Sequence, residues 1–434
     1  MKKIITIVMA GFAIVAMVSC QKENHSGTDA SQFYKIVNLQ PNVGQVIWNP
    51  NEFDFDKGNA GVLEIYAKMA EDAKAGACSS WRNGRYHGRN LDWLQEDYGC
   101  LVLQMPSGKG VKHASVSIVN GNLIVNREFM ARDIVDEKYR HIIPCMAIDG
   151  INDAGVTANI NMLCHTPGDT YINKEECDIS SSCVVRYILD NAGSVDEAIS
   201  LLNEKKICQD VVQVKDYDTH FMISDPTKTA AVEFLNKKMV VTYYNESGHG
   251  CRSDKGNPAI MTNLCNFAVE NWGLGTDDFY DNRPLAMGVE RWETILSQYD
   301  VASRSVNDNF DIAKSVWYFK NYMSKDKFWY TENAGDDYGR DEQGWYCTIN
   351  EKRIACSGWK EAQVKAWDTM PKFWADYDEK YGHLKDPHVR GNDYWETSHT
   401  VIYDLQQKKG YLCAFEEFYS KGARPLEISL PAQN

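Results

Sequence analysis

The sequence predicts an α+β protein built from layered sheets, because of two patterns. Short β-rich segments separated by turn residues recur along the chain, several of them as hairpins. Two probable helices are grouped between these segments, at residues 180–193 and 194–206, the second opened by Ser194 with acidic residues in its first turn. Hairpins with grouped helices favour α+β layers over a parallel βαβ fold. The β-rich segments are residues 100–108, 113–125, 155–163, 220–244 and 399–415.

The first 20 residues, MKKIITIVMAGFAIVAMVSC, have the layout of an export signal: two lysines, a short apolar run and small residues before Cys20. The run is too short to cross a bilayer comfortably. The letters MVSC are similar to a bacterial lipobox with Cys20 as the lipidated residue; an ordinary signal peptide with an incidental Cys20 is the alternative. We therefore expect an exported bacterial lipoprotein, periplasmic or at the outer membrane or cell surface.

Residues 21–77 are predicted to be a tether and a prosegment. The polar stretch 21–32 cannot bury a core and reads as the tether. Residues 58–76 predict a helix, because apolar residues recur at helical spacing. These residues are Val62, Leu63, Tyr66, Met69 and Ala70.

Composition restricts the partners. The formal net charge of −14 opposes sequence-independent binding to nucleic acid and leaves no polybasic membrane patch, so a small molecule is the expected partner and a lipid the expected membrane anchor. The 13 cysteines are scattered without metal-binding spacing, and we expect neither a metal nor a cofactor. Their pattern assigns no disulfide, and homo-oligomerisation is left open.

Residues 325–395 form an insertion dense in aromatic and charged residues. The segment 359–382 predicts helix on both sides of Pro371. The aromatic side chains are better explained as core of an outer layer than as the lining of a substrate lid.

Cys78 follows the helix-forming run directly after Gly76 and Ala77. It could be a buried structural cysteine, half of a disulfide, or a nucleophile released as a new chain terminus by cleavage of the Ala77–Cys78 bond. An N-terminal cysteine carries its own base, since its α-amino group titrates near pH 8 and lies within reach of its sulfur. Locally, the catalytic interpretation is no better supported than the structural one.

The letters GRNLDW that follow at residues 88–93 resemble a motif of the choloylglycine hydrolase family of N-terminal-nucleophile hydrolases. This family includes bile salt hydrolases and penicillin V acylases, and is related to acid ceramidase and N-acylethanolamine acid amidase. The resemblance implies a four-layer αββα sandwich as the catalytic domain, residues 78–434, with Cys78 as nucleophile. It also implies that Arg89 favours the thiolate and that Asp92 orients the α-amino group.

The resemblance extends over most of residues 78–420. DGINDAGV (149–156) is similar to a family turn, and AIMTNLCNF (259–267) places Asn263 at the family's oxyanion-binding asparagine. VERWETIL (289–296) places Arg291 at an arginine near the nucleophile. A second oxyanion residue falls one position out of register with Asn159 and Asn161, of which we prefer Asn161.

The resemblance implies a self-processing cysteine amidase that hydrolyses linear amide C–N bonds. N-acyl ethanolamines, N-acyl amino acids and conjugated bile salts are the candidate substrates, with a bile salt hydrolase proper as the narrower alternative. The long prosegment resembles that of the ceramidase branch, and we expect it to stay with the catalytic piece. The rival from another class is a non-catalytic surface lipoprotein that binds glycans or lipids through residues 325–395.

Overall fold

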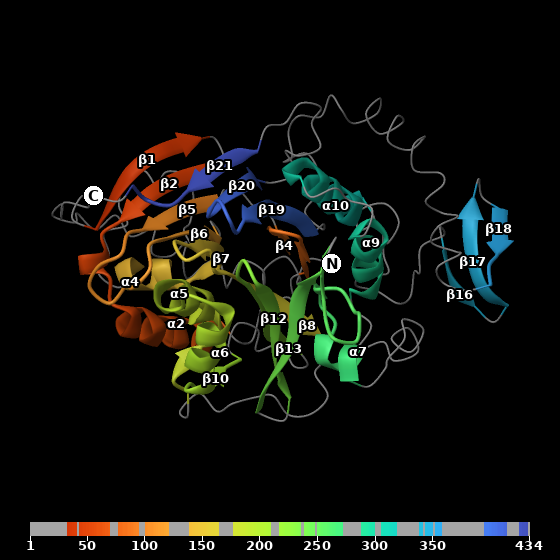
Figure 1. Cartoon of the computed structure of the whole chain (residues 1–434), viewed down its shortest axis with the longest axis horizontal. Helices are drawn as coiled ribbons and strands as arrows, with labels where there is room; N and C mark the ends of the chain where they lie inside the picture. Colours follow the sequence, from red (N-terminus) through yellow and green to blue (C-terminus); the bar gives the residue numbers. More distant parts are fainter. Residues whose placement is uncertain are drawn as a thin grey trace, which may run out of the picture.

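The computed structural model has two large β-sheets packed face to face, with helices on both outer sides (Figure 1). This architecture confirms the predicted α+β fold, a sandwich with four layers. The described residues are 33–40, 43–69, 77–94, 100–120, 139–164, 177–209, 217–235, 238–247, 250–271, 288–299, 305–318, 338–341, 343–349, 352–357, 395–414 and 425–432.

The first sheet has ten strands, and β2 and β5 form its one parallel pair among the described strands. The order across it is β1 (Tyr34–Gln40), β2 (Val43–Trp48), β5 (Cys100–Met105), β6 (Ser115–Asn120), β7 (Ala147–Asn152), β8 (Thr157–Cys164), β11 (Tyr217–Ser224), β12 (Lys228–Leu235), β13 (Lys238–Ser247) and β14 (Gly250–Arg252).

The second sheet has six antiparallel strands. Their order is β15 (Ile260–Met261), β3 (Ala77–Asn83), β4 (Tyr86–Leu94), β19 (Trp395–Asp404), β20 (Lys409–Ala414) and β21 (Leu426–Ser429). A core of side chains from both sheets, including Val102, Ile118, Val401 and Leu412, fills the space between them. The burial of this apolar surface holds the two sheets together.

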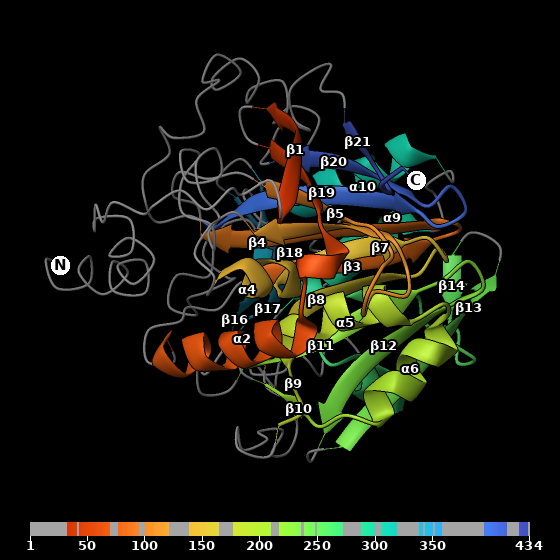
Figure 2. The same cartoon turned by 90° about the vertical axis from the view of Figure 1, so that its left-hand side faces the viewer.

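Helices cover both outer faces of the sandwich. On the ten-stranded sheet, α5 packs on β7 and β8, α6 packs on β11 and β12, and α2 packs on α4. On the six-stranded sheet, α9 packs on β3 and α10 on β4 and β19 (Figures 1 and 2). Their bounds are α2 (Phe55–Met69), α4 (Tyr139–Cys145), α5 (Val184–Asn191), α6 (Val195–Asn203), α9 (Val289–Tyr299) and α10 (Val306–Tyr318).

The predicted strands and helices are confirmed within the described residues. The five β-rich segments contain β5, β6, β8, the β11–β12–β13 meander and the β19–β20 hairpin, and the two predicted helices are α5 and α6. Ser194 caps α6, because its side chain accepts a hydrogen bond from the Glu197 backbone N–H at 3.1 Å. The helix predicted over 58–76 is α2, which the structure describes from Phe55 to Met69.

Residues 33–69 are more structured than the sequence predicted. Strands β1 and β2 form a hairpin, and β2 joins the ten-stranded sheet by pairing with β5. Helix α2 lies against α4, where Gly58 is required: a Cβ there would come within 2.3 Å of Cys145 Sγ and 2.4 Å of His141 O. The signal at 1–20, with Cys20, and the tether at 21–32 lie outside the described residues.

The described part of the 325–395 insertion is a small antiparallel sheet that the sequence analysis did not predict. Its strands are β16 (Tyr338–Asp341), β17 (Gly344–Ile349) and β18 (Lys352–Ala355). The helices predicted around Pro371 lie outside the described residues.

One disulfide, which cysteine spacing could not assign, joins Cys177 to Cys208 beside the short parallel pair β9 (Ile179–Ser180) and β10 (Ile207–Cys208). Helices long and apolar enough to span a membrane are absent from the part of the chain that the structure describes.

Candidate active site

Cys78 is the second residue of β3 and is a buried free thiol, with 4% of its surface exposed. Strands β3 and β4 form a hairpin in which Gly84 takes the positive φ of 57° that the turn requires. Gly88 on β4 is needed for a different reason, because a Cβ there would lie 2.3 Å from the Trp81 ring. This tight hairpin sets the register that brings the GRNLDW motif beside Cys78.

Arg89 lies on the same face of the hairpin as Cys78, since Arg89 pairs with Ser80 and Cys78 pairs with Leu91. Its Nη2 donates to Cys78 Sγ at 3.6 Å and to the Ile160 carbonyl at 2.6 Å. Its Nη1 donates to the Ile148 carbonyl at 2.7 Å. The guanidinium is thus held across the space between the sheets, with its positive charge next to the sulfur.

Asp149 on β7 balances the charge of Arg89 at an N–O distance of 3.3 Å, with both side chains fully buried. It is also 2.7 Å from His399 Nε2 and accepts a hydrogen bond from the Tyr403 hydroxyl at 2.5 Å. Burial raises the pKa of Asp149, but His399, Arg89 and Tyr403 together lower it below its ordinary value. An ionised Asp149 therefore fixes Arg89 from the opposite sheet.

Asp92 lies directly opposite Ala77 in the β3–β4 ladder, next to the backbone nitrogen of Cys78. Its Oδ1 accepts a hydrogen bond from the Thr397 hydroxyl at 2.7 Å. Strand alternation directs its side chain to the face opposite the Cys78 thiol. That position suits a partner for the backbone nitrogen better than a partner for the sulfur.

Asn263 and Arg291 approach Cys78 from the backbone side. The Cys78 N–H donates to Asn263 Oδ1 at 3.5 Å, and Asn263 Nδ2 donates to the Met162 carbonyl at 2.6 Å. Arg291 on α9 donates to both the Cys78 carbonyl and Asn263 Oδ1. Since Nδ2 carries two protons and one satisfies Met162, the amide keeps a second proton for an acceptor at this point.

Gly288 makes this approach of α9 geometrically feasible. It has a φ of +92°, and a Cβ there would lie 2.7 Å from both the Asn263 nitrogen and Thr262 Oγ1. A side chain at this position would push the start of α9, and with it Arg291, away from the Asn263 segment.

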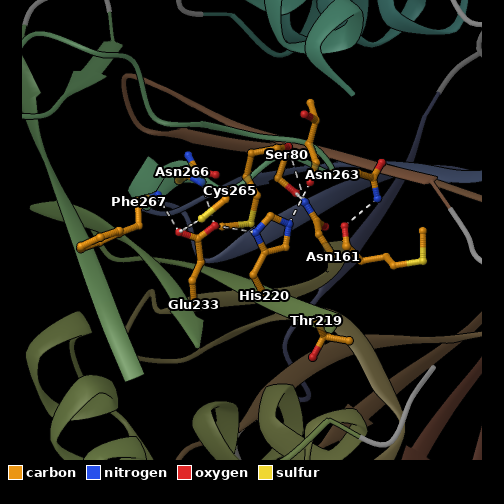
Figure 3. Close-up of polar contacts among 12 residues, drawn as sticks. Ser80, Asn161, Thr219, His220, Glu233, Asn263, Cys265, Asn266 and Phe267 are labelled. Atoms are coloured by element: carbon orange, nitrogen blue, oxygen red, sulfur yellow. Dashed lines mark hydrogen bonds and ion pairs between the residues drawn. The ribbon is translucent and has the colours of Figure 1, made fainter. Parts of the chain in front are cut away.

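Asn161 does not bond to Cys78. Its Nδ2 donates to Ser80 Oγ at 3.0 Å, and Ser80 lies two residues beyond Cys78 on the same face of β3 (Figure 3). Asn159 on the same strand also donates to Ser80 Oγ, at 2.8 Å. Both asparagines therefore face the second sheet near the nucleophile, and the preference for Asn161 as an oxyanion residue stays a prediction.

His87 continues this polar network away from Cys78. One ring nitrogen lies 2.7 Å from Asn159 Oδ1, and the other lies 2.9 Å from the Ser224 hydroxyl and 3.2 Å from that of Thr157. Burial lowers the pKa of His87 to about 3, so the ring is neutral at physiological pH.

The structure thus brings Arg89, Asn263 and Arg291 into hydrogen-bonding contact with Cys78 and places Asp92 beside its backbone. Asn161 instead bonds to Ser80, two residues beyond Cys78. Sequence reasoning did not assign roles to Asp149, His399, Tyr403, His220 and Glu233. The sequence did carry a signal for the polar network between the sheets: Thr157, Asn159 and Asn161 alternate in an otherwise apolar strand, which indicates a polar face. Among the described residues, no cluster of three His, Cys, Asp or Glu side chains is arranged to hold a metal.

The arrangement provides the parts that acyl transfer requires: a buried thiol, a fixed positive charge at its sulfur, and amide and guanidinium donors beside its backbone.

No curated protein matches the chain. Solved structures with similar folds include penicillin V acylase from Agrobacterium tumefaciens, with 14% identity, 81% of this chain and 83% of that chain covered, and a TM-score of 0.36. Two variants of conjugated bile acid hydrolase from Clostridium perfringens are also similar, with 15% and 14% identity, 82% of this chain and 93% and 99% of theirs covered, and TM-scores of 0.39 and 0.36.

The sequence itself matches a family model. The model describes linear amide C-N hydrolases of the choloylglycine hydrolase family, and it matches residues 79–286, beginning directly after Cys78 and including Arg89, Asp92 and Asn263. Over residues 79–286, the chain is thus similar to the choloylglycine hydrolase family of linear amide C-N hydrolases.

Proposed function

We propose that this linear amide hydrolase matures by cleaving its own Ala77–Cys78 bond and then uses Cys78 as an N-terminal nucleophile on N-acyl amides. The observation that carries the proposal is the convergence on Cys78 of Arg89 from β4, Asn263 from the segment after β15, and Arg291 from α9. A non-catalytic binding lipoprotein would have no need of this convergence, and the match of residues 79–286 to a family of hydrolases speaks against that alternative.

The first step of maturation is attack of Cys78 Sγ on the carbonyl carbon of Ala77. A C–S bond forms as the C–N bond breaks, and the thiol proton ends on the released amine. Water then hydrolyses the thioester, which frees the prosegment carboxylate and regenerates the thiol. Arg89 supports the first step, because its charge lies 3.6 Å from the sulfur that must lose its proton.

Amide hydrolysis by the mature enzyme follows the same chemistry on an external carbonyl. The free α-amino group of Cys78 takes the thiol proton and gives it to the leaving amine, and water then hydrolyses the acyl-enzyme. Asp92, next to this nitrogen in the ladder, would orient the amino group. The second proton of Asn263 Nδ2 would bind the negative oxygen of the tetrahedral intermediate.

For the substrate we propose an amide with a long apolar acyl chain: an N-acyl ethanolamine, an N-acyl amino acid or a conjugated bile salt. The support is the aromatic-rich composition, with 12% Phe, Trp and Tyr, and the long segment before Cys78. A bile salt hydrolase proper is the narrower alternative. Substrate choice depends on loops that a fold does not specify, so it has to be measured.

We also propose that Cys20 carries a lipid in an exported bacterial lipoprotein, and that the cleaved prosegment retains the catalytic piece at the membrane. The packing of residues 33–69 supports retention: β2 pairs with β5, and Asn59 on α2 bonds to the backbone of Asp178 and Ser180 at 3.0 and 2.8 Å. These contacts do not depend on the Ala77–Cys78 bond.

The testing experiment is a substrate panel assayed with protein whose cleavage before Cys78 has been verified by mass. The panel contains glycine- and taurine-conjugated bile acids, long-chain acyl ethanolamines, acylated amino acids and penicillin V. We expect long apolar acyl chains to be hydrolysed faster than penicillin V. A correctly cleaved preparation that hydrolyses no amide of the panel would contradict the proposed function.

A further inference from the structure

We propose that His220 and Glu233 are positioning residues that hold Asn263 at its place beside Cys78. The inference rests on the proposed role of Asn263 in amide hydrolysis. Neither side chain contacts Cys78, yet together they fix both ends of the short segment that carries Asn263 (Figure 3).

His220 fixes the start of that segment. It lies on β11, fully buried, with Nε2 at 2.8 Å from the Thr262 carbonyl and Nδ1 at 3.0 Å from Glu233 Oε1. Both ring nitrogens are therefore engaged, Nε2 by a backbone carbonyl that can only accept and Nδ1 by the carboxyl group of Glu233. His220 thus binds the carbonyl of the Thr262–Asn263 peptide bond, directly before Asn263.

Glu233 on β12 fixes the other end. Its Oε1 accepts the Asn266 N–H at 2.8 Å, and its Oε2 accepts the Phe267 N–H at 2.7 Å. These N–H groups belong to the first turn of α7 (Asn266–Asn271), where backbone donors lack partners within the helix. A carboxylate there satisfies two such donors and complements the helix dipole.

The arrangement matters for Asn263 because three separate elements share its amide. The amide lies between the Met162 carbonyl, the Cys78 N–H and Arg291, and each contact requires a defined position of the Asn263 backbone. A misplacement of about 1 Å can lower the rate by about a hundredfold when a donor must meet charge in a transition state. A buried His–Glu contact used for fold stability alone would not need to bind the peptide next to that donor.

Two substitutions of His220 separate the contacts of its two nitrogens. In His220→Gln the amide nitrogen lies near the position of Nε2, so donation to Thr262 is kept. In His220→Asn the shorter amide reaches only the position of Nδ1, so the hydrogen bond to the Thr262 carbonyl is lost. We expect His220→Asn to lower kcat by about tenfold to a hundredfold with little change in KM, and His220→Gln to restore most of the loss.

The decisive readout is a double-mutant cycle with Asn263→Ala, measured on the panel amide that the wild type hydrolyses fastest. If His220 acts through Asn263, His220→Asn should lower kcat in the wild-type background and leave it almost unchanged in the Asn263→Ala background. Equal losses in both backgrounds, or an unchanged kcat in the otherwise wild-type protein, would overturn the inference. Asn263→Ala alone tests the proposed function, so the two failures are distinguishable.

Thr219→Val is the matched control. Thr219 is the preceding residue on β11, and its side chain points away from Asn263 and donates to Gln209 Oε1 at 2.5 Å (Figure 3). This variant also loses a buried hydrogen bond of β11, and we expect a lower thermal midpoint with unchanged kcat. If His220→Asn does not fold, Glu233→Gln, which keeps the shape and one acceptor oxygen, takes its place in the cycle with the same expected non-additivity and the same contradicting outcome.

Discussion

The segments before and after the Ala77–Cys78 bond are built into different sheets. Residues 33–69 extend the edge of the ten-stranded sheet and pack α2 against α4. Residues 78–94 form the β3–β4 hairpin inside the six-stranded sheet, between β15 and β19. The first segment is held by backbone pairing and helix packing, whereas the second carries the buried polar groups around the thiol.

This difference indicates how cleavage can occur without disassembly. Neither segment depends on the other for its strand partners, because β2 pairs with β5 and β3 pairs with β4 and β15. Cleavage between them would free an α-amino group while leaving both sheets paired. Substitutions in residues 78–94 should therefore change cleavage and amide hydrolysis. Substitutions in residues 33–69 should change how firmly the prosegment stays bound to the catalytic piece.

The largest effect is expected from Cys78→Ala, which removes the group that attacks in both proposed reactions. The variant should remain one chain and hydrolyse no amide, while folding as the wild type does, since alanine fits a buried position of this size. Gel electrophoresis and the substrate panel measure the two losses. A Cys78→Ala protein that still separates before residue 78 would show that another protease makes the cut.

Asn263→Ala should have the next largest effect. It removes the donor that we propose for the oxyanion, and the loss of one such donor typically lowers kcat by about a hundredfold to a thousandfold. KM should change much less, because the negative charge develops only near the transition state. Steady-state kinetics on the best panel amide measures both, and a raised KM with unchanged kcat would assign Asn263 to substrate binding instead.

Gly58→Val tests the prosegment side alone. The added side chain would clash with Cys145 Sγ and the His141 carbonyl, so α2 should lose its packing on α4 at a cost of about 1 to 3 kcal/mol. The cleaved variant should release its catalytic piece from the prosegment during size-exclusion chromatography. Ala60→Val on the exposed side of α2 is the matched control and should co-elute as the wild type does. Release by both variants, or by neither, would contradict retention through α2.

At neutral pH His87→Gln should have the smallest effect of these variants, because its effect appears as a change in how stability depends on pH. The pKa of His87 is about 3 in the folded protein and near the ordinary histidine value of 6.5 when unfolded. Between these values the unfolded chain binds one more proton, so this residue's contribution to stability is present above pH 6.5 and is lost as the pH falls toward 3. Glutamine does not titrate, so the free energy of unfolding should fall less steeply for the variant, by about 1.4 kcal/mol per pH unit.

Denaturant unfolding at pH 4, 5, 6 and 7 measures that difference. Asp190, whose pKa burial raises to about 6, titrates in both proteins and cancels in the comparison. Parallel pH profiles for wild type and His87→Gln would show that His87 is not held neutral.

Much of the fold could be predicted from the sequence, because alternation and caps are local. The α6 cap at Ser194 and the β8 pattern needed only a few neighbouring residues. Strands β1 and β2 were missed, because their place in the sheet is set by a parallel pairing with β5 that local pattern does not specify. The disulfide of Cys177 and Cys208 was missed for the same reason.

The site could be predicted only as far as the family motifs reach. Cys78, Arg89, Asp92, Asn263 and Arg291 were named as a set, and the structure gathers them around one thiol or its backbone, while their catalytic roles stay predictions. Asp149 and His220 act on them from other strands, through contacts that depend on how the two sheets and the α7 segment pack. Such partners have no local signature.

The central claim is that Cys78 is the first residue of the active catalytic chain. Intact-mass analysis and N-terminal sequencing of purified, active protein test it most directly. We predict two pieces that separate on denaturation, the larger one beginning at Cys78. Full amidase activity in a preparation where the Ala77–Cys78 bond is intact would contradict the account, because the α-amino base would then not exist.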